Sequence, residues 1–119
     1  MSSQNKQGDV LATREVVREM LEIMDNFDRA FGAVKPETDA EKAIEEEYRA
    51  VYQSILDTFG DLGVEVIETV GKEFDYELHQ AVMQRPSDEY EEGIVMEEFQ
   101  KGFIMGDTLI RASMVAVAA

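Results

Sequence analysis

The sequence has 119 residues, with 26 Asp and Glu side chains against 11 Lys and Arg, which gives a formal net charge of -15. This charge opposes binding to nucleic acid and to anionic membranes, and the absence of cysteine excludes disulfides and thiolate metal sites. Because 45% of the residues are hydrophobic, we expect the chain to fold. The charge leads us to expect a soluble protein with neither nucleic acid nor membrane among its partners.

The first part of the chain is predicted to be a helical hairpin. Residues 1–9 are mostly polar and are predicted to be disordered or a vector-derived remnant. Over residues 10–31, apolar side chains recur every three or four positions, which predicts a helix. A second helix is expected from a cap at Thr38 or Asp39 to about Gly60. Two helices with a short connection form an antiparallel hairpin, which we place over residues 10–62.

Each predicted helix carries an apolar stripe that is too wide for the other helix to cover alone. Two copies of the hairpin could bury these stripes in a four-helix bundle, or the second half of the same chain could cover them. We favour the homodimer because twofold homo-oligomers are the commonest assembly. The predicted dimer interface comprises Val17, Met20, Met24, Phe27, Phe31, Ile44, Tyr48, Val51 and Ile55.

Residues 63–119 change to short β-branched and alternating runs separated by Gly and Pro. The runs lie at residues 64–70, 80–84, 93–105 with a break at Gly102, and 109–117. They predict a small antiparallel sandwich or partly closed barrel. The expected fold class is therefore α+β: a helical hairpin forming a dimeric four-helix bundle, followed by a small all-β domain.

The residues give little sign of catalysis. His79 follows Asp75 by four positions, but one His and one carboxylate complete neither a metal site nor a nucleophilic triad. We interpret His79 as a structural residue bonded to its own loop, and the acidic runs as solvated faces. The sequence therefore predicts no enzymatic activity, no catalytic residue, no metal and no cofactor.

Residues 99–103 bring two aromatic rings, a cation and a glycine together in a chain otherwise dominated by acid. Arg111 lies on the following run, and aromatic residues with Arg dominate interface hot spots. An ordinary hairpin with one inward Phe and one solvent-facing Lys explains the same residues equally well. The composition by itself leaves both interpretations open.

Five blocks of the sequence, taken in order, resemble the GrpE family of nucleotide exchange factors for DnaK-type chaperones. The blocks are Met24–Ala30, Leu62–Ile67, Phe74–Val82, Gln100–Phe103 and Gly106–Val115. Each block alone is weakly specific, whereas five in the same order are specific. The resemblance runs from about Arg14 to Val117.

The resemblance implies a homodimer whose β domain binds the nucleotide-binding domain of the chaperone and opens its cleft, so that ADP leaves. It also implies that the contact surface includes Phe99, Gln100, Lys101, Gly102, Phe103, Thr108 and Arg111. The chain departs from the family at Thr108 and Tyr76, where Arg and Pro are common.

Because family members usually begin with a long paired helix, the resemblance implies that this chain is a fragment lacking most of that helix. It also implies that the protein is located in a bacterial cytoplasm or inside an organelle, where chloroplast stroma is favoured over mitochondrial matrix. An alternative function is a structural homodimerisation module whose β domain binds another protein.

Overall fold

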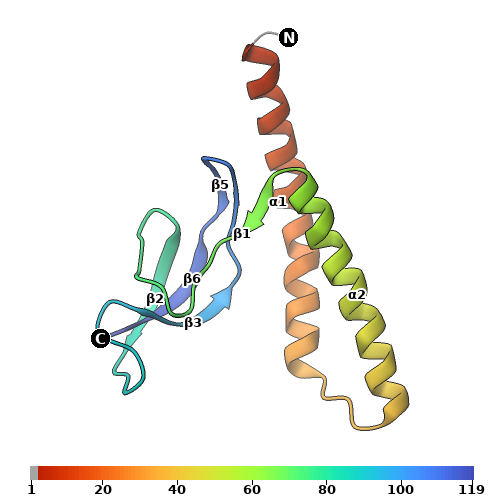
Figure 1. The fold of residues 1–119 in the computed structure, drawn as a ribbon, viewed down its shortest axis with the longest axis vertical. Coiled ribbons are helices and arrows are strands. Elements are labelled where there is room, and N and C mark those ends of the chain that lie inside the picture. The colour runs from red at the N-terminus through yellow and green to blue at the C-terminus, as the bar shows by residue number, and fades with distance from the viewer. Residues whose placement is uncertain (1–2) are drawn as a thin grey trace. The chain divides into compact units, whose positions relative to one another are not determined.

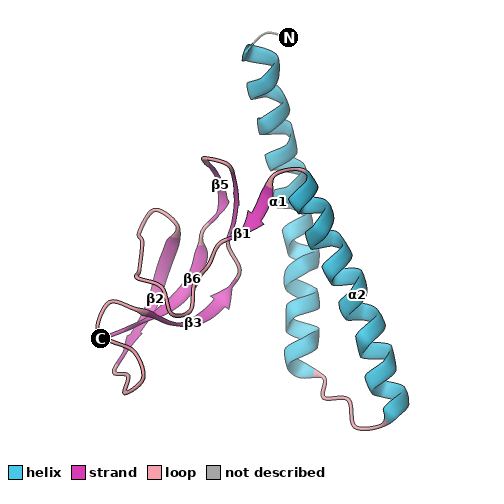
Figure 2. Cartoon of the chain, viewed as in Figure 1, coloured by secondary structure: helices cyan, strands magenta, loops and turns pink. Residues whose placement is uncertain are grey.

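The computed structural model describes residues 3–119, with side chains described from Gly8 onward. The chain divides into two compact units, Met1–Gly63 and Val64–Ala119 (Figure 1). The first unit is helical and the second is built of strands and loops (Figure 2). The α+β class that the sequence predicts is confirmed.

Two antiparallel helices make up the first unit: α1 spans Ser3–Ala33 and α2 spans Asp39–Asp61 (Figure 1). Helix α1 begins at Ser3, so residues 3–9 are helical where the sequence predicts a disordered start; residues 1 and 2 lie outside the described residues. Residues 3–9 contain no proline and a single glycine, so nothing local stops the helix from continuing toward the N-terminus.

Thr38, one of the two caps that the sequence predicts, is the N-cap of α2. Its hydroxyl accepts a hydrogen bond from the backbone N–H of Glu41 at 3.1 Å. The Glu41 carboxylate in turn accepts from the backbone N–H of Glu37 at 3.0 Å. These reciprocal bonds satisfy backbone donors that have no partner within the helix, and they fix where the interhelical loop ends.

Aromatic side chains hold the two helices together near the loop. The rings of Phe27 and Phe31 on α1 lie 5.9 Å and 5.7 Å from the Tyr52 ring on α2, both edge-on. Val17 and Met24 on α1 are buried, and their spacing of seven residues places them on one face of the helix. Val17 and Met24 are therefore shielded from solvent, while Phe27 and Phe31 make the ring contacts with α2.

The second unit contains two three-stranded sheets. One has the order β1-β4-β5 with antiparallel pairing, and the other has the order β2-β6-β3. The strands are β1 Val64–Val66, β2 His79–Arg85, β3 Val95–Gln100, β4 Phe103–Met105, β5 Thr108–Arg111 and β6 Ser113–Ala118. β6 pairs antiparallel with β3 but parallel with β2, so the expectation of a purely antiparallel domain is wrong. The reason is that the chain passes through β3, β4 and β5 before β6 returns beside β2.

Apolar side chains of β3 and β6 form a small core in this unit. Val95, Val115 and Val117 are buried together, with Phe74 packed against them. On β6 the next residues, Ala116 and Ala118, are also buried. They pair with Glu97 on β3 and Arg85 on β2, respectively, and these two charged residues form an ion pair. The small alanines thus leave room for an ion pair between residues of the two outer strands.

Candidate functional site

Strands β3 to β6 form one long hairpin that changes sheet at its middle. β3 pairs with β6 in one sheet, while β4 pairs with β5 in the other. At the tip, Met105 pairs with Thr108 around Gly106, whose φ of 58° suits the first central position of a type II′ turn. At the bend, a Cβ on Gly102 would lie 2.4 Å from the backbone N of Ser113. We call this bend, residues 100–103 with 111–113, the corner.

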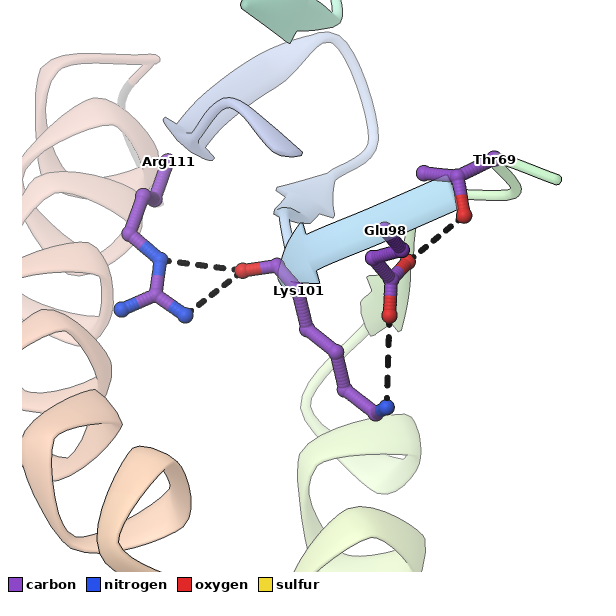
Figure 3. A network of polar contacts seen from close by, with 4 residues as sticks. All are labelled: Thr69, Glu98, Lys101 and Arg111. Carbon is purple, nitrogen blue, oxygen red and sulfur yellow. Dashed lines mark hydrogen bonds and ion pairs between the residues drawn. The ribbon is translucent and has the colours of Figure 1, made fainter. Parts of the chain in front are cut away.

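Arg111 bonds across the corner to the backbone of Lys101. Its Nε and Nη2 atoms donate to the Lys101 carbonyl oxygen at 3.0 Å and 2.6 Å (Figure 3). The guanidinium carbon also lies 5.8 Å from the centroid of the Phe103 ring, the residue with which Arg111 pairs in the β4–β5 ladder. Arg111 therefore ties the two strands of the hairpin together where it bends.

A second polar group holds the Lys101 side chain. The Glu98 carboxylate accepts from the Thr69 hydroxyl at 2.6 Å and from the Lys101 ammonium at 3.4 Å (Figure 3). Thr69 is 8% exposed, and the Lys101 and Glu98 side chains are 31% and 20% exposed. The backbone and the side chain of Lys101 are thus held by two different residues.

The structure separates the seven residues predicted to contact a partner by their exposure. Phe99 is 46% exposed. Four are half-buried: Gln100, Lys101, Thr108 and Arg111. Gly102 and Phe103 are buried, and Phe103 is only 1% exposed. Any part that these two play in an interface is to support their exposed neighbours from within.

Sequence reasoning missed Glu98 and Thr69 as members of this network. It assigned Glu98 to an acidic, solvated face, whereas its carboxylate is bonded to a hydroxyl 29 residues away in the chain. A pairing of that sequence separation leaves no periodic signal in the residues themselves.

His79 is bonded to its own loop, in agreement with the interpretation of this residue from the sequence. It is 5% exposed, and its Nδ1 atom accepts from the backbone N–H of Asp75 at 3.0 Å. Its Nε2 atom lies 2.9 Å from the carbonyl oxygen of Glu68, which assigns the proton to Nε2. Both ring nitrogens therefore serve to close the loop between β1 and β2.

The helical unit carries two apolar grooves, each lined by both helices. The first has a volume of about 540 Å³ and is lined mainly by Ile23, Phe27, Phe31, Val34, Ile44 and Tyr48. The second has a volume of about 410 Å³ and lies toward the other end of the hairpin, lined mainly by Val16, Val17, Met20, Ile55, Phe59 and Leu62. Val17 and Phe59 in the second groove are buried, so the apolar surface left open along the grooves is carried by residues such as Val16, Ile23, Val34, Ile44 and Tyr48.

The predicted dimer residues differ in how far the hairpin itself covers them. Val17 and Met24 are buried, and Met20, Phe27, Phe31 and Ile55 are half-buried. The most exposed are Ile44 at 53%, Tyr48 at 57% and Val51 at 50%.

Val16, Ile23 and Val34 are more than half exposed along the grooves, yet the sequence did not assign them to the interface. The feature of the sequence that could have assigned Val16 and Ile23 to the interface is their spacing of seven residues. Two adjacent rows of α1 share that spacing, so the pattern could not show which row faces α2.

Two negative observations concern the part of the chain that the structure describes. Within residues 3–119, neither helix combines the length and hydropathy that a bilayer crossing requires. In the same residues, no three His, Asp or Glu side chains gather closely enough to hold a metal ion.

Comparisons with known proteins agree on one family. The GrpE family model matches residues 1–119. The chain is 44% identical over 111 residues to Protein GrpE of Trichormus variabilis, covering 93% of this chain and 45% of that protein. It is 44% identical over 105 residues to Protein GrpE of Bacillus pumilus, covering 88% of this chain and 56% of that protein. The chain spans about half the length of the curated relatives it matches, and it belongs to the GrpE family.

Proposed function

We propose that the chain is a nucleotide exchange factor that binds the nucleotide-binding domain of a DnaK-type chaperone and opens its cleft to release ADP. The observation that carries this proposal is the GrpE match along all 119 residues, which includes the whole β unit. That unit presents an exposed aromatic ring, Phe99, two residues before Lys101, whose ammonium is bonded to Glu98, on an otherwise acidic chain.

Exchange of this kind requires binding energy and no chemical step. A protein that binds the open conformation of the chaperone more tightly than the closed one shifts the equilibrium toward the open state. Because coupling between two ligands is reciprocal, bound ADP weakens the binding of the chain by the same factor by which the chain weakens ADP. No side chain of the chain has to act as an acid, base or nucleophile.

We propose further that two copies of the chain pair through the helical unit to form a four-helix bundle. The grooves of about 540 Å³ and 410 Å³ lie along an apolar face that includes Ile23, Ile44 and Tyr48, all more than half exposed. A second copy presents the same apolar face, which makes the pairing self-complementary. Burial of these side chains removes apolar area from water and stabilises the pair.

The setting we propose is a bacterial cytoplasm or a chloroplast stroma. The relatives in Trichormus variabilis and Nostoc support it, since both are cyanobacterial.

Release of a fluorescent ADP analogue from a purified DnaK-type chaperone tests the exchange activity. We expect the chain to accelerate release in a saturable way, and unchanged release at saturating chain would contradict the proposal. A stable complex with a different protein in that case would support a dimerisation module whose β unit binds another partner.

The contact surface is tested by a matched pair of truncations in the β unit. Phe99→Ala should weaken binding to the chaperone about tenfold, because exposed aromatic side chains are frequent hot spots. Met83→Ala is the control, since Met83 is 44% exposed and Phe99 is 46% exposed. Equal losses of affinity in both variants, or no loss in Phe99→Ala, would show that Phe99 is not part of the contact surface.

A further inference from the structure

We propose that Arg111 is a positioning residue, which fixes the corner through the Lys101 carbonyl so that the Lys101 ammonium is presented to the partner in one place. This inference rests on the proposed function, and it changes the role of Arg111 from a contact residue to a support. The partner surface that fits a positioned cation is one bearing carboxylates or backbone carbonyls.

The corner needs such a support because the strand ladders stop on either side of it. The last pair between β3 and β6 is Gln100 with Met114, and the first pair between β4 and β5 is Phe103 with Arg111. Lys101 and Gly102 belong to neither ladder. A backbone carbonyl at such a break requires another donor, and the Arg111 side chain supplies it to Lys101.

The geometry at this carbonyl requires a guanidinium group. Nε and Nη2 of Arg111 converge on one oxygen from two directions, at 3.0 Å and 2.6 Å (Figure 3). The planar group also faces the buried Phe103 ring. An ammonium has a compact charge and cannot form the same fork. Lysine at this position would keep the positive charge but lose the restraint.

Two independent restraints then converge on Lys101. Arg111 fixes its backbone, while Glu98, itself bonded to Thr69, fixes its ammonium. A side chain that is ordered before binding loses less conformational entropy on binding, which is worth roughly a 3- to 10-fold gain in affinity. Gly102 permits this arrangement because it brings the Lys101 segment against Ser113.

The first test is a double-mutant cycle on binding of the chain to the chaperone nucleotide-binding domain. Arg111→Lys should weaken binding about as much as Arg111→Ala, by roughly 5- to 10-fold. In the Lys101→Ala background, Arg111→Lys should add less than about a twofold loss. Lys72→Ala is the control for removing a cation from the same unit, because the ion pair between Lys72 and Glu68 is exposed.

Two outcomes of this cycle would overturn the inference. Wild-type affinity in Arg111→Lys, with a loss in Arg111→Ala, would show that the charge of Arg111 itself contacts the partner. Equal losses from Arg111→Lys with and without Lys101→Ala would show that Arg111 acts independently of Lys101.

The second test uses the free chain and does not depend on the partner. Amide hydrogen exchange at Gly102 and Phe103 should be about tenfold faster in Arg111→Lys, because the corner opens locally more often. Lys101→Ala keeps the backbone carbonyl and should leave this exchange unchanged. Unchanged amide exchange in Arg111→Lys would overturn the inference. Failure of the wild-type chain to accelerate ADP release from the chaperone would contradict only the proposed function.

Discussion

Gly102 shows how a single residue decides the shape of the β unit. Its φ is not in the left-handed region, so the requirement for glycine here is steric. A Cβ would lie 2.4 Å from both N and Oγ of Ser113 and 2.8 Å from the Arg111 carbonyl oxygen. Two of these three atoms belong to the backbone and cannot rotate away. The corner therefore has room only for the hydrogen side chain of glycine at position 102.

Gly102→Ala should therefore destabilise the β unit by about 3 kcal/mol, the upper range for overpacking a closed site. Urea unfolding followed by the methyl NMR signals of Val95, Val115 and Val117 would report this unit specifically. Gly60→Ala is the matched control, because its added Cβ would have no atom within 4 Å apart from its chain neighbours and the backbone of its own helix. It replaces a glycine in helix α2 of the other unit and should leave the unfolding of the β unit unchanged. A loss below about 0.5 kcal/mol in Gly102→Ala would contradict the steric account.

The neighbours of Gly102 differ in how well the sequence predicted them. Family resemblance alone places Lys101, Phe103 and Arg111 in one candidate surface. It could not show that Phe103 is buried or that Arg111 bonds to a backbone carbonyl, because both depend on where the hairpin bends. The bend is fixed by contacts between the two halves of the hairpin, and no local pattern encodes these contacts.

At the scale of the elements, helix α2 begins where its first residues require it to begin. The Thr38 hydroxyl and the Glu41 carboxylate each accept a backbone N–H at the helix start. Asp39 and Glu41 lie in the first turn, where negative charge interacts favourably with the helix dipole. All these features are local, so the sequence narrowed the cap to Thr38 or Asp39, and the structure shows that it is Thr38.

Thr38→Ala should lower the stability of the helical unit by about 1 kcal/mol, because the Glu41 N–H loses its acceptor. Thermal unfolding followed by the helical circular dichroism signal measures this change. Thr58→Ala provides the comparison on the same helix, since its hydroxyl only donates to the Ser54 carbonyl oxygen. Alanine has the higher helix propensity, so that variant should be neutral or slightly stabilised. Equal destabilisation by the two variants would argue against the cap.

The strands were predicted less completely than the helices. The runs at 80–84 and 93–105 correspond to β2 and to β3 with β4, and the break at Gly102 is present. The run at 64–70 forms a strand only over Val64–Val66, because the following residues turn to pair with the segment near Val95. The parallel pairing of β2 with β6 has no signature in short alternating runs, since strand direction is set by the path of the chain.

At the scale of the whole molecule, the open question is what covers the grooves of the helical unit. Val16, Ile23, Ile44 and Tyr48 are more than half exposed, which is unusual for apolar side chains arranged in one continuous stripe. A second hairpin is the occupant that we propose.

Ile23→Asp combined with Tyr48→Asp should convert a dimer into a monomer, because two copies would each bury unpaired carboxylates. Sedimentation velocity measures the change directly. Gln53→Asp adds one carboxylate on the opposite side of α2, where Gln53 bonds to Asp57, and should leave the dimer intact. A wild-type chain that sediments as a monomer at high micromolar concentration would contradict the bundle.

The charge of -15, the periods of the two helices, a cap at Thr38 or Asp39 and the family were all determined by the sequence alone. The charge depends on composition, the helical periods and the cap depend on residues within a few positions of one another, and the family depends on five blocks that keep their order along the chain. The row of α1 that faces α2, the parallel pairing of β6, and the bonds of Arg111 and Glu98 at the corner were decided only by the tertiary structure. Each of them joins residues far apart in the chain, and local propensity carries no information about such pairings.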